Sequence, residues 1–235
     1  MGSGSASEAR PLDSGADLDR GVVVRRDVGT GRSILIIDCR RSDSRESHHC
    51  TDSFIAAFSE SLRVVELSVP PPRGAKEWGS VSQRIEELLA GLGIRYGAVL
   101  GVGEGSVIAQ HLAITRPKIC QSLIVVDPVF ELSETFLGRF VARVESVLPL
   151  GLPLRIGGDQ FASAPFLHRI RCPTLVVVSA QVGAASAREM ESMARRIPNA
   201  WYQMLNATDD SVEFIELVRT FLPIRNRHPM RRAVG

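Results

Sequence analysis

Long apolar runs and a strong charge imbalance are both missing from this sequence of 235 residues. No run approaches the ~18–20 consecutive apolar residues of a membrane span, so no membrane span is expected. The first twenty residues contain no apolar stretch, which argues against a signal peptide. Net charge is +2, and four arginines near the C-terminus supply more than this excess, so no nucleic-acid partner is expected. The composition therefore predicts a soluble, cytoplasmic globular protein.

Paired metal-ligand and cofactor motifs are missing as well. The four cysteines form no C-x-x-C pair, so neither a zinc site nor a disulfide framework is indicated. These cysteines are Cys39, Cys50, Cys120 and Cys172. The adjacent His48 and His49, followed by Asp52, have no distant partners at ligand spacing. The nearby glycines do not make G-x-G-x-x-G, because Ser106 stands at the last position, and we expect neither a metal nor a cofactor.

The two ends of the chain differ in composition from its middle. Residues 1–20 are rich in Gly, Ser and acidic residues and lack hydrophobic periodicity, which predicts a disordered segment. Residues 224–235 form a basic tail that Pro229 interrupts, and we interpret this tail as solvated. A single domain is expected between these ends, over residues 21–223.

Short β-branched runs alternate with helical patterns through this domain. The expected strands are 21–26, 33–38, 63–67, 97–100, 122–126, 173–178 and 201–205. The expected helices are 82–91, 105–116, 186–197 and 211–221, the last two with Ser186 and Ser211 as N-caps. Apolar strands without alternation are typical of a parallel sheet that helices cover on both faces. We therefore predict a doubly wound, mostly parallel α/β sheet, with its ligand site beyond the carboxyl ends of the strands.

Residues 129–170 interrupt this alternation between two core strands. They contain a helical stretch over 133–147, a Pro/Gly-rich passage and a short second element around Phe166. We interpret the insertion as a small lid, because lids close over pockets and exclude water. Its phenylalanines suggest an apolar ligand, although aromatic residues on such helices more often serve packing.

Three stretches of the sequence together resemble a known superfamily. Residues 97–128, GAVLGVGEGSVIAQHLAITRPKICQSLIVVDP, resemble a strand, a G-x-S-x-G turn, a helix and a strand ending in V-D-P. Residues 170–222 begin with IRCPTLVVV and end in an amphipathic helix, and residues 29–70 pass from an apolar strand through a polar loop and a helix to RVVELSVP. In this order the stretches resemble the α/β-hydrolase superfamily, over about 190 residues. The resemblance implies an α/β-hydrolase-like fold with its first strand or two abbreviated.

Four catalytic positions of that superfamily hold other residues here. Gly103 stands where the nucleophilic serine belongs, so that G-x-S-x-G reads G-V-G-E-G. Glycine adopts the strained backbone of this turn at little cost, so the resemblance implies a turn that persists without its nucleophile. The loop that should carry the acid reads S-A-Q-V-G, and no histidine occurs between His168 and His228. Asp38 and Cys39 replace His-Gly at the oxyanion-hole loop, where a carboxylate would repel an oxyanion.

Five residues near these positions remain candidates for chemistry. Ser106, in the first turn of the next helix, is a candidate displaced nucleophile, although a serine there usually caps or packs. Cys39 is a second candidate nucleophile, although a thiol without a nearby histidine is more often an inert apolar residue. Glu104, Asp38 and Asp127 are candidate acids or bases. Glu104 also suits a solvated helix N-terminus, and Asp127 a structural hydrogen bond.

The sequence therefore predicts a catalytically degenerate α/β-hydrolase-like protein. We expect this pseudoenzyme to bind a small apolar ligand or to dock onto a protein partner, without hydrolysis. A second hypothesis is an enzyme without a triad, a carboxylate-based lyase, isomerase or cyclase that uses Asp38, Glu104 and Asp127 for proton transfer. A third hypothesis is a divergent hydrolase with its nucleophile displaced to Ser106 or Cys39. The sequence assigns no oligomeric state.

Overall fold

The computed structural model describes residues 21–39, 52–72, 75–129, 162–206 and 211–223. Within these residues the chain forms a seven-stranded sheet in the order β1-β3-β2-β4-β5-β6-β7. The strands are β1 Val23–Val28, β2 Ser33–Cys39, β3 Arg63–Val69, β4 Gly97–Val102, β5 Cys120–Val126, β6 Thr174–Ser179 and β7 Ala200–Leu205. The helices are α1 Asp52–Ser59, α2 Ala75–Gly91, α3 Gly105–Thr115, α5 Ala184–Ala194 and α6 Val212–Phe221, with a 3-10 helix η1 at Ala164–Arg169.

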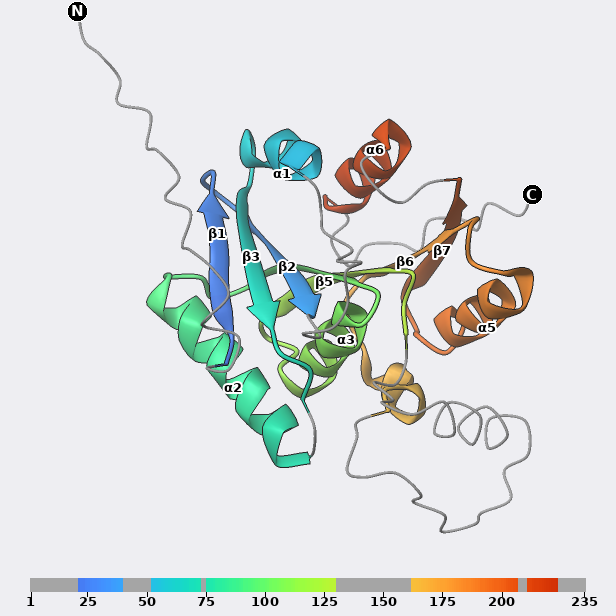
Figure 1. Ribbon diagram of the computed structural model, residues 1–235, viewed down its shortest axis with the longest axis horizontal. Helices are drawn as coiled ribbons and strands as arrows, with labels where there is room; N and C mark the ends of the chain where they lie inside the picture. Colours follow the sequence, from blue (N-terminus) through green and yellow to red (C-terminus); the bar gives the residue numbers. More distant parts are fainter. Residues whose placement is uncertain (1–20, 40–51, 73–74, 130–161, 207–210, 224–235) are drawn as a thin grey trace, which may run out of the picture.

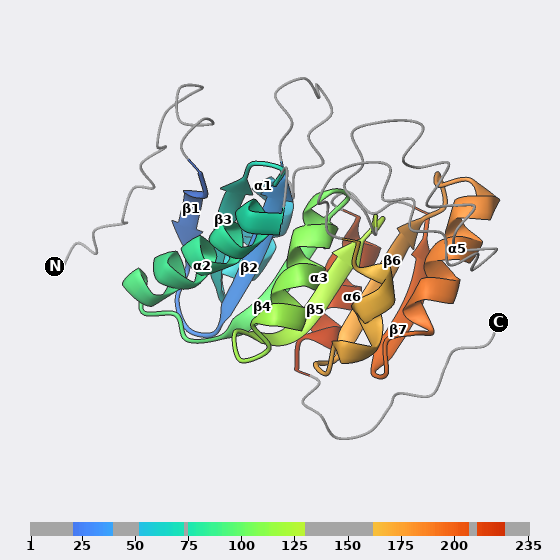
Figure 2. The same cartoon turned by 90° about the horizontal axis from the view of Figure 1, so that it is seen from below.

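The sheet is covered by helices on both faces. Strands β2 to β7 pair in parallel, and β1 pairs antiparallel with β3 at one edge. Helices α1 and α6 lie over one face and α2, α3 and α5 over the other (Figure 1). Figure 2 shows the latter three in front of the sheet. This arrangement confirms the predicted doubly wound, mostly parallel α/β sheet.

Successive residues of an inner strand enter two separate cores. On β2, Leu35 and Ile37 join the core that contains α2, α3 and α5, whereas Ile34 and Ile36 join the core that contains α1 and α6. All four side chains are at most 2% exposed. Because both faces are buried, the strand reads as one continuous apolar run instead of an alternation.

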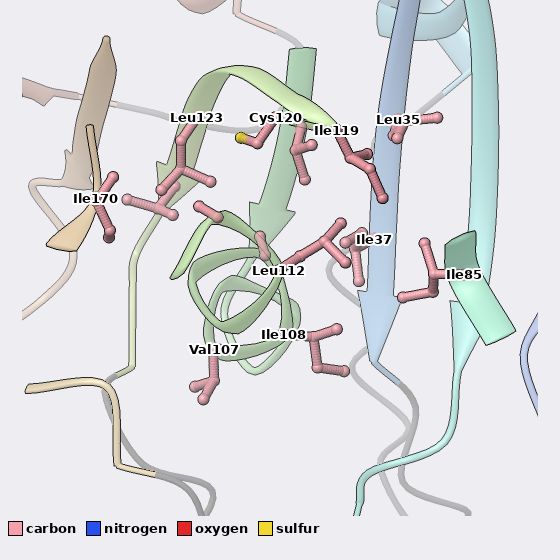
Figure 3. Packing of buried hydrophobic residues seen from close by; sticks show 14 of the residues in the cluster. Leu35, Ile37, Ile85, Val107, Ile108, Leu112, Ile119, Cys120, Leu123 and Ile170 are labelled. Atoms are coloured by element: carbon pink, nitrogen blue, oxygen red, sulfur yellow. The ribbon is translucent and has the colours of Figure 1, made fainter. Parts of the chain in front are cut away.

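Helix α3 is buried along most of its length. Every residue from Gly105 to Ala113 is buried. Figure 3 shows Val107, Ile108 and Leu112 of this helix packed among residues of the first core, including Ile37 of β2. This packing holds the N-terminus of α3 at the carboxyl ends of β2 and β4, the edge of the sheet where ligands bind in such folds.

The edge strand β1 is joined to β3 by ion pairs as well as by the backbone ladder. Arg63 of β3 makes two hydrogen bonds to the Asp27 carboxylate, at 2.8 and 2.7 Å. Arg26 lies 3.2 Å from the Glu66 carboxylate, which is buried, and it also contacts Asp52. A buried carboxylate requires such a partner, so β1 supplies the cation that lets Glu66 stand among the buried residues of β3.

Helix α2 is longer than the sequence pattern predicted. It begins at Ala75, not at Ser82, which lies inside the helix. Trp78 in the early turns is buried and stands on the same face as Ile85, at a spacing of seven residues. The prediction missed these turns because a single buried tryptophan among polar residues gives little periodicity.

One of the two predicted helix caps is confirmed. The Oγ of Ser211 accepts a 3.1 Å hydrogen bond from the Phe214 N–H at the start of α6. The prediction for Ser186 is wrong, because α5 begins at Ala184 and its N-cap residue is Gly183. The helix that the superfamily resemblance implied within residues 29–70 is α1, and its first residue is Asp52.

Several predictions fall outside the described residues. These are the disordered segment 1–20, the basic tail 224–235, the lid helix 133–147 and the adjacent histidines at 48–49. Of the predicted lid over 129–170, residues 129 and 162–170 are described, and the latter contain η1, whose Leu167 is buried in the first core. Among the described residues, no helix is long and apolar enough to cross a membrane.

Candidate functional site

The carboxyl ends of adjacent parallel strands carry the candidate residues. Strand β2 ends at Asp38 and Cys39, β4 leads into Gly103 and Glu104, and Asp127 follows β5. The sheet pairs β2 with β4 and β4 with β5, so these strand ends meet at one edge. The fold therefore gathers the predicted residues around the N-terminus of α3.

A sharp turn at Gly103 joins β4 to α3. Gly103 has a φ of 51°, a left-handed conformation that is costly for any residue with a side chain. Its N–H donates a 2.9 Å hydrogen bond to the Val126 carbonyl at the end of β5. This is the strand–turn–helix geometry of a nucleophile elbow, with glycine at its centre.

The two flanking glycines allow α3 to approach the strands closely. A Cβ at Gly105 would lie 2.2 Å from the Ile37 carbonyl oxygen of β2. A Cβ at Gly101 would lie 2.6 Å from the Gly105 carbonyl oxygen. Packing thus explains the outer glycines of G-V-G-E-G, and backbone conformation explains the central one.

The Ser106 hydroxyl is buried and engaged by backbone groups. Its Oγ lies 2.5 Å from the Gly103 carbonyl and 3.2 Å from the Val129 carbonyl, to either of which it donates, and it accepts a 3.0 Å bond from the Val129 N–H. The Nε2 of Gln110 donates to the same Val129 carbonyl at 3.2 Å. Ser106 therefore joins the turn to the segment that follows β5.

The Asp127 carboxylate joins the ends of two strands. Its Oδ1 accepts a 2.6 Å hydrogen bond from the Ser179 N–H at the end of β6, and its own N–H donates to the Val177 carbonyl at 2.9 Å. With a φ of 42°, Asp127 is the only non-glycine residue of the described chain in the left-handed region. Aspartate tolerates this conformation better than most residues.

Asp38, Cys39 and Glu104 surround the start of α3. Asp38 is buried, and Cys39 and Glu104 are partly exposed. The Cys39 backbone nitrogen would lie 3.4 Å from a Cβ at Gly105, so the end of β2 directly adjoins the elbow. Glu104 precedes the first residue of α3, where a carboxylate interacts favourably with the helix dipole.

His111 of α3 is turned toward α2. Its Nδ1 lies 2.8 Å from the Ser82 hydroxyl, and its ring centroid lies 4.9 Å from that of Trp78. Burial, together with the charge of Arg116, lowers the pKa of His111 to about 4, so the ring is neutral near pH 7. In the part of the chain that the structure describes, no group of three or more His, Cys, Asp or Glu residues is placed to hold a metal ion.

Sequence reasoning missed Gln110, Val129 and Ser179. The contributions of Val129 and Ser179 are backbone groups, which every residue except proline carries, so no sequence signal identifies them. Gln110 could have been identified from the sequence, because it is a polar residue in a mostly apolar helix. Its Oε1 is buried and has no hydrogen-bond partner among the described residues.

Comparisons with known proteins identify the fold. No protein-family model and no curated protein matches the sequence. An esterase from Thermogutta terrifontis is 18% identical with a TM-score of 0.62, over 86% of this chain and 93% of the esterase. An enol-lactonase from Burkholderia xenovorans is 16% identical with a TM-score of 0.62. The match covers 89% of this chain and 99% of the lactonase. An α/β-hydrolase enzyme from a sediment metagenome of the Mar Chica lagoon is 18% identical with a TM-score of 0.62. The match covers 92% of this chain and 98% of that enzyme.

These structural neighbours confirm the fold that the sequence motifs implied. The matches cover 86–92% of this chain and 93–99% of the other protein in each pair. The chain therefore has the α/β-hydrolase fold. At these sequence identities the likeness extends to the fold and no further.

Proposed function

We propose that this chain is a non-hydrolytic α/β-hydrolase-fold protein, a pseudoenzyme that binds a small apolar ligand. The observation that carries the proposal is a glycine at the left-handed centre of the elbow, Gly103. Glycine has no side-chain atom that attacks a carbonyl, so the turn presents no nucleophile. The same conformation strains a serine, whereas glycine adopts it freely.

The residues around the turn support the proposal. The nearest serine hydroxyl along the helix, that of Ser106, is buried and hydrogen-bonded to backbone groups on both sides. Asp127 accepts a hydrogen bond from the Ser179 N–H, a contact that joins the ends of β5 and β6. Asp38 stands at the end of β2, where the superfamily resemblance puts the oxyanion-hole loop, and a carboxylate in that loop would oppose negative charge that develops on a substrate oxygen.

The chemistry of the structural neighbours supplies the ligand class. They include an esterase and an enol-lactonase. A protein that keeps this fold and lacks the elbow nucleophile is expected to bind esters or lactones without cleaving them. We place this function in the cytoplasm, because the spacing of the four cysteines indicates no disulfide framework. Docking onto a protein partner is the alternative role.

A fluorophosphonate, which labels activated serines regardless of substrate, tests the loss of hydrolysis. We expect no adduct by intact mass on the wild type, with an active serine hydrolase as the positive control. The matched variant Gly103→Ser returns a hydroxyl to the centre of the elbow. It is also expected to stay unlabelled, because the chain between His168 and His228 has no histidine to activate it. An adduct on Ser106 of the wild type would replace the proposal with a displaced nucleophile.

Ligand binding is tested by the thermal unfolding midpoint in the presence of p-nitrophenyl butyrate and of a γ-lactone. We expect the midpoint to rise with ligand concentration, while nitrophenol release stays at the level of a heat-inactivated control. Release above that control would refute the proposal. If the triple variant Asp38→Asn, Glu104→Gln and Asp127→Asn lost this release, the result would support the second hypothesis, an enzyme that uses these carboxylates for proton transfer. No midpoint shift with any ester or lactone would favour the protein-docking role.

A further inference from the structure

Two thiols lie next to each other at the amino ends of β5 and β6, the opposite edge of the sheet from the elbow. Cys120 is the first residue of β5, and Cys172 lies just before β6. Their sulfur atoms are 3.7 Å apart, although 52 positions separate the two residues in the sequence. Both are free thiols.

An irregularity in β5 places Cys120 on the same face as Cys172. Gly97 pairs with Cys120 and Ala98 pairs with Ser122, so Gln121 is an extra residue in the ladder. Regular alternation would put Gln121 on the face of Leu123. The extra residue puts Cys120 there instead, in the first core, against which Cys172 packs. Figure 3 shows Cys120 next to Leu123, with Ile170 nearby.

The two thiols differ in exposure and in acidity. Cys120 is 3% exposed, whereas Cys172 is partly exposed, so a small oxidant in solution reaches Cys172 first. The hydrogen bond between the two sulfurs lowers the pKa of Cys172 and raises that of Cys120, with burial adding to the rise at Cys120. Since the thiolate is the form that oxidants attack, both differences select Cys172 as the reacting group.

We propose that Cys120 and Cys172 are a reversible oxidation site, which forms a disulfide in the presence of a hydroperoxide. The Cys172 thiolate attacks one oxygen of hydrogen peroxide, the O–O bond breaks, and a sulfenic acid forms while hydroxide leaves and takes up a proton as water. The Cys120 sulfur then attacks the Cys172 sulfur, the S–O bond breaks, and the departing hydroxide leaves with the Cys120 proton as a second water. Two thiols are thus oxidised to one disulfide and one peroxide is reduced to two waters.

The geometry permits this bond. A disulfide has a sulfur–sulfur distance of about 2.05 Å, so the sulfurs must approach by roughly 1.7 Å. Cys172 lies in the connection that precedes β6, outside the strand, where side-chain rotation and a small backbone shift need not break the sheet ladder. The inference does not depend on the proposed function, because neither thiol adjoins the elbow.

Thiol counting by mass spectrometry tests the proposal on the full chain. The protein is reduced, exposed to stoichiometric hydrogen peroxide, alkylated with N-ethylmaleimide and digested. We expect two of the four cysteines to escape alkylation and a peptide pair joined through Cys120 and Cys172, which dithiothreitol separates. The double variant Cys39→Ser with Cys50→Ser is the matched control, since it keeps only the proposed pair and should lose both remaining thiols on oxidation.

Single variants separate the two roles. In Cys120→Ala, the Cys172 sulfenic acid has no resolving thiol and should be trapped by dimedone, then proceed to sulfinic acid with excess peroxide. In Cys172→Ser, Cys120 should stay reduced at the same peroxide concentration. The proposal is overturned if the wild type reaches sulfinic acid at Cys172 as readily as Cys120→Ala does. It is equally overturned if all four wild-type thiols remain alkylatable.

Discussion

Replacing Gly105 with alanine should strongly destabilise the protein. The added Cβ would lie 2.2 Å from the Ile37 carbonyl oxygen, and an ordinary contact begins at 3.4 Å, so α3 and β2 would have to separate by about 1.2 Å. The obstructing atom belongs to the backbone of a central strand and cannot rotate away. Overpacking of this kind costs about 1–3 kcal/mol, and a rigid backbone on both sides places Gly105→Ala at about 3 kcal/mol or more.

Gly79→Ala in α2 is the matched control for this prediction. Gly79 is exposed, and a Cβ there meets nothing within 4 Å. In a helix interior the same substitution should stabilise the protein by about 0.5–1 kcal/mol, because alanine loses less conformational entropy on folding. Gly101→Ala, with its nearest contact at 2.6 Å, should fall between the two.

Urea unfolding followed by tryptophan fluorescence and circular dichroism measures the three free energies of unfolding. The expected order of stability is Gly79→Ala above the wild type, then Gly101→Ala, then Gly105→Ala. A loss below about 1 kcal/mol for Gly105→Ala would refute the close approach of α3 to β2, since no such overlap could be accommodated so cheaply. Close packing of α3 against the strands would then not explain the glycines at positions 101 and 105.

Three further predictions concern the elbow and the buried histidine. Ser106→Ala should lower the free energy of unfolding in urea by about 1–3 kcal/mol, because the Val129 N–H loses its buried acceptor; an unchanged value would contradict the assigned hydrogen bonds. Gly103→Ser should cost about 1–2 kcal/mol in the same assay, because φ is 51°, and a stabilised variant would show that the turn is not left-handed. His111 has a native pKa near 4, below its ordinary 6.5, so its stabilising contribution is full above about pH 6.5 and is lost as pH falls toward 4. The wild type should lose about 2 kcal/mol more than His111→Gln between about pH 8 and pH 5, and equal pH slopes would refute the burial of the neutral ring.

The fold and the key feature of the site could be predicted from local sequence. Continuous apolar runs identified strands buried on both faces, and their alternation with amphipathic helices identified the doubly wound sheet. The spacing G-V-G-E-G between a strand and a helix located the turn, and Gly103 within it. These signals are local, because the periodicity of a strand or helix and the chemistry of a tight turn are set by residues within a few positions of each other.

The tertiary structure decided which groups meet across long separations. The Val129 backbone beyond β5 meets the Ser106 hydroxyl, and the Ser179 N–H at the end of β6 meets the Asp127 carboxylate. Cys120 and Cys172 carry no pairing motif, and they meet because one extra residue in β5 turns Cys120 onto the face of its neighbour. Such contacts depend on strand register and on sheet order, which no short stretch of sequence encodes. The sequence by itself therefore determined the scaffold and the position of Gly103 in the turn, and only the packed chain decided the partners of the remaining polar groups.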